Sequence, residues 1–157
     1  MNQLKMSWTA ALCMLIVSIT CIDAFANDVL VNFEYNNAPK AYVKTLEIKK
    51  TGAYRVYMVG RHYKKITPEL LNEGKLSANS VEDIKKVLEN WNKSNVEGRY
   101  SSGINATDQP SYTFRFYEED KPTMISISPS TSDKSFPTEL KEDLDMLLGI
   151  FFKVLSD

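Results

Sequence analysis

Residues 42–59, YVKTLEIKKTGAYRVYMV, consist of two alternating segments joined by a turn. In the first segment Leu46 and Ile48 share one face and polar side chains the other, and in the second Val56 alternates with polar neighbours in the same way. Such alternation is typical of strands with one buried face. Because Gly52 provides a turn signal between the two segments, the sequence predicts a β-hairpin here.

A second hairpin is predicted further along the chain. Residues 111–117, SYTFRFY, alternate aromatic with polar side chains, and residues 122–128 return with Ile125 and Ile127 on one face. The charged segment 118–121 separates them as the turn. This is the clearest strand pattern in the chain.

Each hairpin is followed by a predicted helix. Residues 81–93 carry apolar side chains at helical spacing, with Ser80 as the expected cap and Asp83 completing a near-capping box. The last helix is expected over residues 138–155. Its apolar face is broad and widens towards the C-terminus, so it needs cover from another segment or from a partner.

This order of elements predicts one α+β domain with an antiparallel sheet of four to five strands and both helices packed on one face. Residues 29–35 alternate and are expected to form either a strand or an extended arm. Residues 60–78 are ambiguous, with a short strand possible near their end. Residues 99–110 and 129–136 are expected to be polar loops.

The N-terminus is typical of an export signal. Lys5 precedes an apolar run, which ends in a small-x-small pattern at Ala26. We therefore expect residues 1–26 to be a cleaved signal peptide, and residues 27–157 to be the mature domain, periplasmic or secreted. Two alternatives remain open: a leader retained as a membrane anchor, and acylation of Cys21. Membrane association is expected only in those two cases.

The composition of the chain argues for binding rather than catalysis. Nineteen Lys and Arg nearly balance twenty Asp and Glu, so no nucleic-acid partner is expected. Both cysteines, Cys13 and Cys21, lie in the leader, and His62 is the single histidine. The mature chain therefore lacks the residues of a catalytic triad or a zinc site, and it has no glycine-rich phosphate loop. We expect no enzyme, no metal and no cofactor, although distant carboxylates leave a hydrolase open as an alternative.

Three further features of the sequence are not expected to form a catalytic or binding site. The basic stretch 61–65 is expected to be solvated. Asn92 and Asn105 begin glycosylation sequons, which matter only in a eukaryotic secretory route. Asp108 precedes the second hairpin, where its side chain is expected to fix the loop rather than to act in catalysis.

Alternation also predicts a binding surface on the open face of the sheet. If the apolar residues face the helices, Arg55, Tyr57, Arg115 and Tyr117 point outward. Arg and Tyr are enriched in interface hot spots. We therefore predict that these four residues form the centre of a protein interface, with the 99–110 loop at its rim.

The order of motifs resembles a family of small exported bacterial domains of unknown function. The resemblance covers roughly residues 43–150, and its motifs are Leu46-Glu47-Ile48, Gly52-x-Tyr54-x-Val56-Tyr57, Trp91, Tyr100, Asp108-Gln109-Pro110 and the closing helix from Pro137. The chain has neither of the cysteines that often flank a Pro in the first hairpin of that family. A looser likeness is to small bacterial protease inhibitors, and it implies a binding role by analogy.

These observations give three functional expectations. The first is an exported, non-enzymatic protein-binding module, such as an inhibitor or an immunity protein acting in the periplasm. The second is an envelope or lipid-associated structural protein. The third is a hydrolase with an unrecognised carboxylate site.

Overall fold

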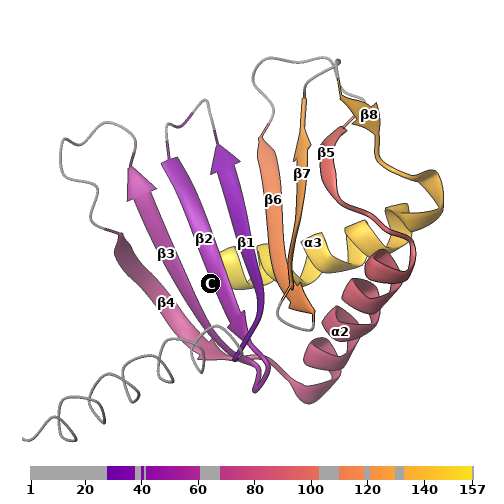
Figure 1. Cartoon of the computed structure of the whole chain (residues 1–157). Helices are drawn as coiled ribbons and strands as arrows, with labels where there is room; N and C mark the ends of the chain where they lie inside the picture. The colour runs from indigo at the N-terminus through magenta and orange to yellow at the C-terminus, as the bar shows by residue number, and fades with distance from the viewer. Residues whose placement is uncertain are drawn as a thin grey trace, which may run out of the picture.

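The computed structural model describes residues 28–37, 40, 42–60, 68–102, 110–118, 121–129 and 133–156. These residues form one sheet of eight strands and two α-helices (Figure 1). The expected leader with its two cysteines, His62, Asn105 and Asp108 lie outside the described residues.

The strands and helices follow one another as β1 (Val29–Asn37), β2 (Tyr42–Lys49), β3 (Ala53–Gly60), β4 (Glu69–Lys75), α2 (Ala78–Lys93), β5 (Gly98–Ser101), β6 (Ser111–Glu118), β7 (Lys121–Ser128), β8 (Lys134–Ser135), the 3₁₀ turn η1 (Thr138–Leu140) and α3 (Lys141–Ser156).

The sheet is larger than predicted and is not purely antiparallel. Its order is β4-β3-β2-β1-β6-β7-β5-β8, and β5 runs parallel to both β7 and β8. The prediction of four to five antiparallel strands was therefore wrong. Both missed strands lie in segments expected to be loops, and at four and two residues they are too short to show an alternating pattern.

The first strand, β1, lies in the middle of the sheet. Val31 is opposite Ile48 of β2 on one side and Phe116 of β6 on the other. The alternative of an extended arm is thus excluded. Because β1 is flanked on both sides, its apolar residues reach the core between those of the two predicted hairpins.

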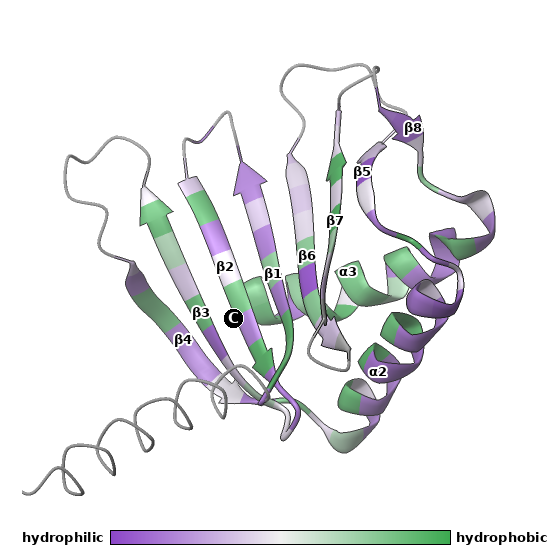
Figure 2. Cartoon of the chain, viewed as in Figure 1, coloured by the Kyte–Doolittle hydropathy of each residue, from purple (hydrophilic) through white to green (hydrophobic). Residues whose placement is uncertain are grey.

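Both predicted hairpins are present. In the first, β2 and β3 meet at Gly52, whose φ of 84° is strained for residues with a side chain. A Cβ atom at Gly52 would also lie 2.9 Å from Val81 Cγ2. The second hairpin pairs β6 with β7. Figure 2 shows the predicted alternation as hydrophobic and hydrophilic bands along β2 and β3.

Helix α2 begins earlier than predicted. Its N-cap is Ser77, whose side-chain oxygen accepts a hydrogen bond from the Ser80 backbone N–H at 3.1 Å. The expected cap, Ser80, thus lies within the first turn. The apolar face is as predicted, since the buried residues of the helix are Val81, Ile84, Val87, Leu88 and Trp91.

The last predicted helix is divided into two parts. Residues 138–140 form the 3₁₀ turn η1, and α3 continues to Ser156. At the C-terminal end of α3, Lys44 of β2 donates a hydrogen bond from Nζ to the carbonyl oxygen of Leu155 at 2.7 Å. This contact ties the end of the helix to the sheet and places a positive charge where carbonyl groups are unpaired.

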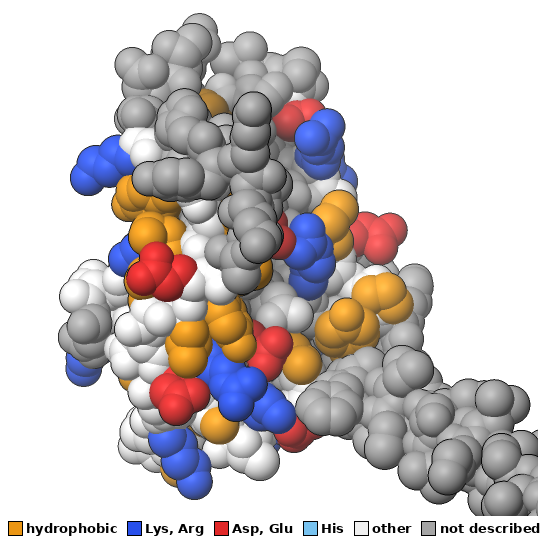
Figure 3. Space-filling view, turned by 90° about the vertical axis from the view of Figure 1, so that its left-hand side faces the viewer, with side chains coloured by type: hydrophobic (Ala, Val, Ile, Leu, Met, Phe, Trp, Pro, Cys, Tyr) orange, Lys and Arg blue, Asp and Glu red, His pale blue; other side chains and the backbone are white. Residues whose placement is uncertain are grey.

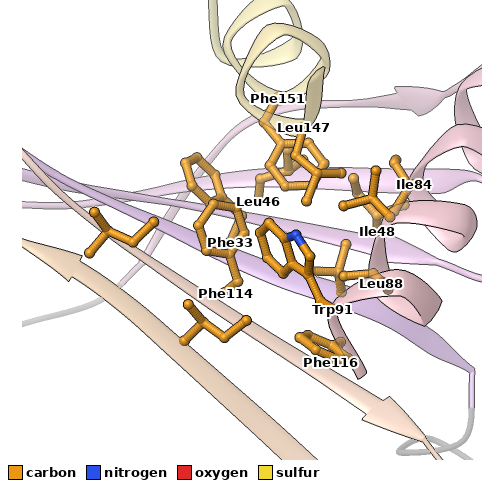
Figure 4. Close-up of a cluster of buried hydrophobic side chains, with 14 of the residues drawn as sticks. Phe33, Leu46, Ile48, Ile84, Leu88, Trp91, Phe114, Phe116, Leu147 and Phe151 are labelled. Carbon is orange, nitrogen blue, oxygen red and sulfur yellow. The ribbon is translucent and has the colours of Figure 1, made fainter. Parts of the chain in front are cut away.

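The core lies between the sheet and both helices (Figure 4). Phe33 of β1 packs against Phe114 of β6 and against Phe151 of α3, each with ring centroids 5.0 Å apart. Trp91 of α2 meets Phe114 edge-on at 5.3 Å. Since Phe114 contacts Trp91 of α2 and Phe151 of α3, both helices cover one face of the sheet, as predicted. The buried Trp91 Nε1 has no acceptor among the described residues, so packing alone holds the indole.

Candidate functional site

The two faces of the sheet differ sharply in character. The inner face packs against the helices and carries buried residues of the central strands, such as Val56 of β3 and Phe114 of β6. The outer face is the opposite one. Strand alternation places the predicted interface residues on it, and these are Arg55, Tyr57, Arg115 and Tyr117.

On β3, the side chains of Arg55 and Tyr57 interact with each other. The pKa of the Arg55 guanidinium is raised above its ordinary value, chiefly by hydrogen bonding to the Tyr57 side chain and then by the nearby carboxylates. Arg55 Nε lies 3.6 Å from Glu73 Oε2 of β4. Opposite Tyr57 on β4 is Leu70, which is 49% exposed. We call Arg55, Tyr57 and Leu70 the β3 patch.

A shallow hollow adjoins the β3 patch. It has a volume of about 450 Å³ and is lined by Arg55 together with Glu47, Lys49 and Glu73. Its charged residues are two cations and two anions. The hollow therefore offers fixed charges of both signs within reach of a partner, with no excess of either sign.

On β6, Arg115 and Tyr117 belong to a second patch. Arg115 forms an ion pair with Glu34 of β1 through its terminal nitrogen. Met124 of β7, 48% exposed, lies opposite Arg115, and the exposed Pro122 lies opposite Tyr117. We call Arg115, Tyr117, Pro122 and Met124 the β6 patch.

The β6 patch also borders a hollow, a small one of about 130 Å³. Tyr117 and Leu30 line it from the sheet, and Leu88 and Lys85 line it from α2. This position places Tyr117 at the margin of the sheet near α2 rather than over its middle. An apolar side chain of modest size would fit in the hollow.

The structure does not gather the four predicted residues into one centre. In the row that contains Arg55 and Arg115, Glu47 of β2 and Asn32 of β1 lie between them. Three strand spacings separate the backbones by about 14 Å. Each Arg is close to its own Tyr, while the two pairs form separate patches with a polar strip between them. The sequence could not show this separation, because β1 inserts between β2 and β6.

The expected rim of the interface is described only in part. Arg99 is the exposed second residue of β5 and lies opposite Ser126 of β7, and residues 103–109 lie outside the described part of the chain. Three exposed apolar members of the patches, Leu70, Pro122 and Met124, were missed. Met124 alternates with Ile125 in a predicted strand and was therefore detectable, whereas Leu70 lies in the stretch whose structure was ambiguous.

Among the described residues, no three His, Cys, Asp or Glu side chains group together so that they could hold a metal ion. Neither of the two described α-helices has the length and apolar character needed to cross a membrane.

Comparison with known proteins adds no relative, because no family model and no curated protein matches the chain.

Proposed function

We propose that the chain is an exported, non-enzymatic protein-binding module of the inhibitor or immunity kind, and that it meets its partner through the outer face of the sheet. The observation that carries the proposal is the composition of the two patches. Each patch combines an Arg, a Tyr and an exposed large apolar side chain, Leu70 or Met124. Arg, Tyr and Met are enriched at protein interfaces.

The rigidity of the strands supports this proposal. Every patch residue lies on a strand that is paired with its neighbours in the sheet, with one register shift beside Tyr57, so its backbone is already ordered before a partner binds. Tyr also loses little side-chain freedom on binding. Both patches therefore present contact area at a low entropic cost.

The distance between the patches is compatible with a single partner. An interface of standard size covers about 800 Å² on each partner, which is wide enough to span both patches. The strip between them, which includes Thr45 of β2 and Asn32 of β1, is polar and partly exposed. We therefore propose two hot spots flanking a hydrated centre.

The test begins with an unbiased pull-down from the native envelope. Binding of the recovered protein is then measured for Tyr57→Ala, Arg115→Ala and the double variant. We expect the double variant to lose about 3 kcal/mol or more of affinity while its melting temperature stays within a few degrees of the parent. The single losses should add, because the two patches are more than about 10 Å apart.

Thr45→Ala with Asn32→Ala is the matched control, since both residues lie on the outer face, on the two strands between the patches. We expect this variant to keep its affinity within about 0.5 kcal/mol. A well-folded Tyr57→Ala/Arg115→Ala protein that binds as tightly as the parent would contradict the proposal. A loss confined to one of the single variants would reduce the interface to one patch.

A further inference from the structure

A groove on the other side of the sheet has no role in the proposed function. It has a volume of about 520 Å³ and lies between α3, the start of α2 and the edge formed by β3 and β4. Figure 3 views the molecule from this β4 edge, where hydrophobic side chains lie among basic and acidic ones. The volume falls within the range of small-molecule sites, about 300–1,000 Å³.

Apolar side chains form one part of the groove wall, while Ser77 and Ser80 at the start of α2 and three charged residues form the rest. Tyr54 contributes from β3, Leu76 from the segment after β4, and Met146, Ile150 and Val154 from α3. Met146 is 47% exposed, whereas most large apolar side chains of the described residues are buried or half-buried. Methionine adapts its shape readily and is favoured at surfaces that bind apolar chains.

The charged residues of the groove are two lysines and one aspartate. Lys75 and Lys153 are both exposed, and neither forms an ion pair with any described residue. Asp145 precedes Lys153 by two turns of α3, about 12 Å along the axis, so it does not neutralise that lysine. The groove thus combines apolar side chains with two cations that no carboxylate of the described residues pairs with.

Gly149 keeps the groove open. It lies within α3, where glycine destabilises a helix by about 1 kcal/mol relative to alanine. No atom lies within 4 Å of a Cβ built at Gly149, so packing within the described chain does not require a glycine there. A larger side chain would point into the groove that Gly149 lines.

We propose that this groove binds a long-chain carboxylate, with the alkyl chain along Met146, Gly149 and Ile150 and the head group at Lys75 and Lys153. The apolar wall accounts for the chain and the unpaired lysines account for the anionic head. This inference is independent of the outer-face interface, because the groove shares no residue with either patch.

Laurate is the probe, titrated calorimetrically below its micellar concentration into the protein purified after export. Decanoate should bind up to about fifteenfold more weakly, because each buried methylene contributes about fourfold. Dodecyl maltoside tests the same chain with a neutral head, and acetate tests the head alone. We expect both to bind at least about tenfold more weakly than laurate.

Two variants locate the site. Gly149→Leu should fill the groove and weaken laurate binding about tenfold or more, while its melting temperature stays equal or rises because leucine favours the helix. Lys75→Gln/Lys153→Gln should weaken laurate binding and leave dodecyl maltoside binding unchanged. Lys93→Gln/Lys141→Gln is the matched control, since these exposed lysines lie outside the groove.

Three outcomes would overturn the proposal. The first is the absence of laurate binding by the parent protein. The second is equal laurate binding by a folded Gly149→Leu protein. The third is binding to phosphatidylglycerol vesicles with none to laurate, which would assign the groove to a membrane surface instead. None of these results depends on the outer-face interface.

Discussion

The inner and outer faces of the sheet are built by the same strands, yet they have opposite energetic roles. Phe33 and Phe114 on the inner face are fully buried and packed by both helices, while Glu34 and Arg115 on the outer face form an ion pair exposed to solvent. A buried aromatic contributes several kcal/mol to stability, and an exposed ion pair contributes about 1 kcal/mol or less. Neighbouring residues on one strand should therefore differ greatly in their effect on folding.

The largest difference is expected on β1. Phe33→Ala removes a ring at the centre of the core and should lower the free energy of unfolding by about 3–5 kcal/mol. Its neighbour Asn32 lies on the outer face, and Asn32→Ala should change that free energy by no more than about 0.5 kcal/mol. Urea denaturation of both variants measures these two changes in the free energy of unfolding. Equal losses would mean that the outer face also contributes to the core.

An intermediate loss of stability is expected for a substitution on the edge strand β4. A Cβ atom at Gly74 would lie 2.6 Å from the hydroxyl oxygen of Tyr54, so Gly74→Ala forces that ring to move. We expect a loss of about 1 kcal/mol, at the lower end of the cost of overpacking. In a Tyr54→Ala background the same substitution should cost almost nothing, which thermal denaturation of the four proteins will show. An undiminished cost in that background would assign the effect to the backbone.

The smallest effect is expected for the outer-face ion pair. Arg115→Ala should cost about 0.2–1 kcal/mol, because the pair with Glu34 is well solvated. A double-mutant cycle with Glu34→Ala isolates the pair energy, and this energy should fall further at high salt. A coupling above about 2 kcal/mol would show that this part of the outer face is more structural than its exposure indicates.

Local patterns predicted the parts of the fold that local interactions determine. Alternation in residues 42–59 and 111–128 gave both hairpins, and apolar spacing gave both helices. The four-residue β5 gave no such signal, because it is held by parallel pairing with a strand that follows the second hairpin's turn. The N-cap was assigned to Ser80 instead of Ser77 because both are serines that precede an apolar repeat.

For the candidate site, too, local patterns predicted only what local interactions determine. Alternation placed Arg55 and Arg115 on the face away from the helices, which the structure shows. Their role in binding stays a prediction. The distance between them depends on the order of the strands, and this order is set by the long-range pairing of β1 with β6. No local pattern in the sequence carries that information.

The central position of β1 has a consequence for how the chain folds. Strands β1 to β4 pair with their neighbours along the chain, and so do β6 and β7, but the pairing of β1 with β6 joins segments far apart in the sequence, such as Glu34 and Arg115, which are 81 residues apart. Closing so long a loop is slow compared with forming a hairpin. The pairing of β1 with β6 is therefore the step that joins the β1–β4 unit and the β6–β7 hairpin into one sheet. Until β1 and β6 pair, each of them exposes an unpaired strand edge to other chains.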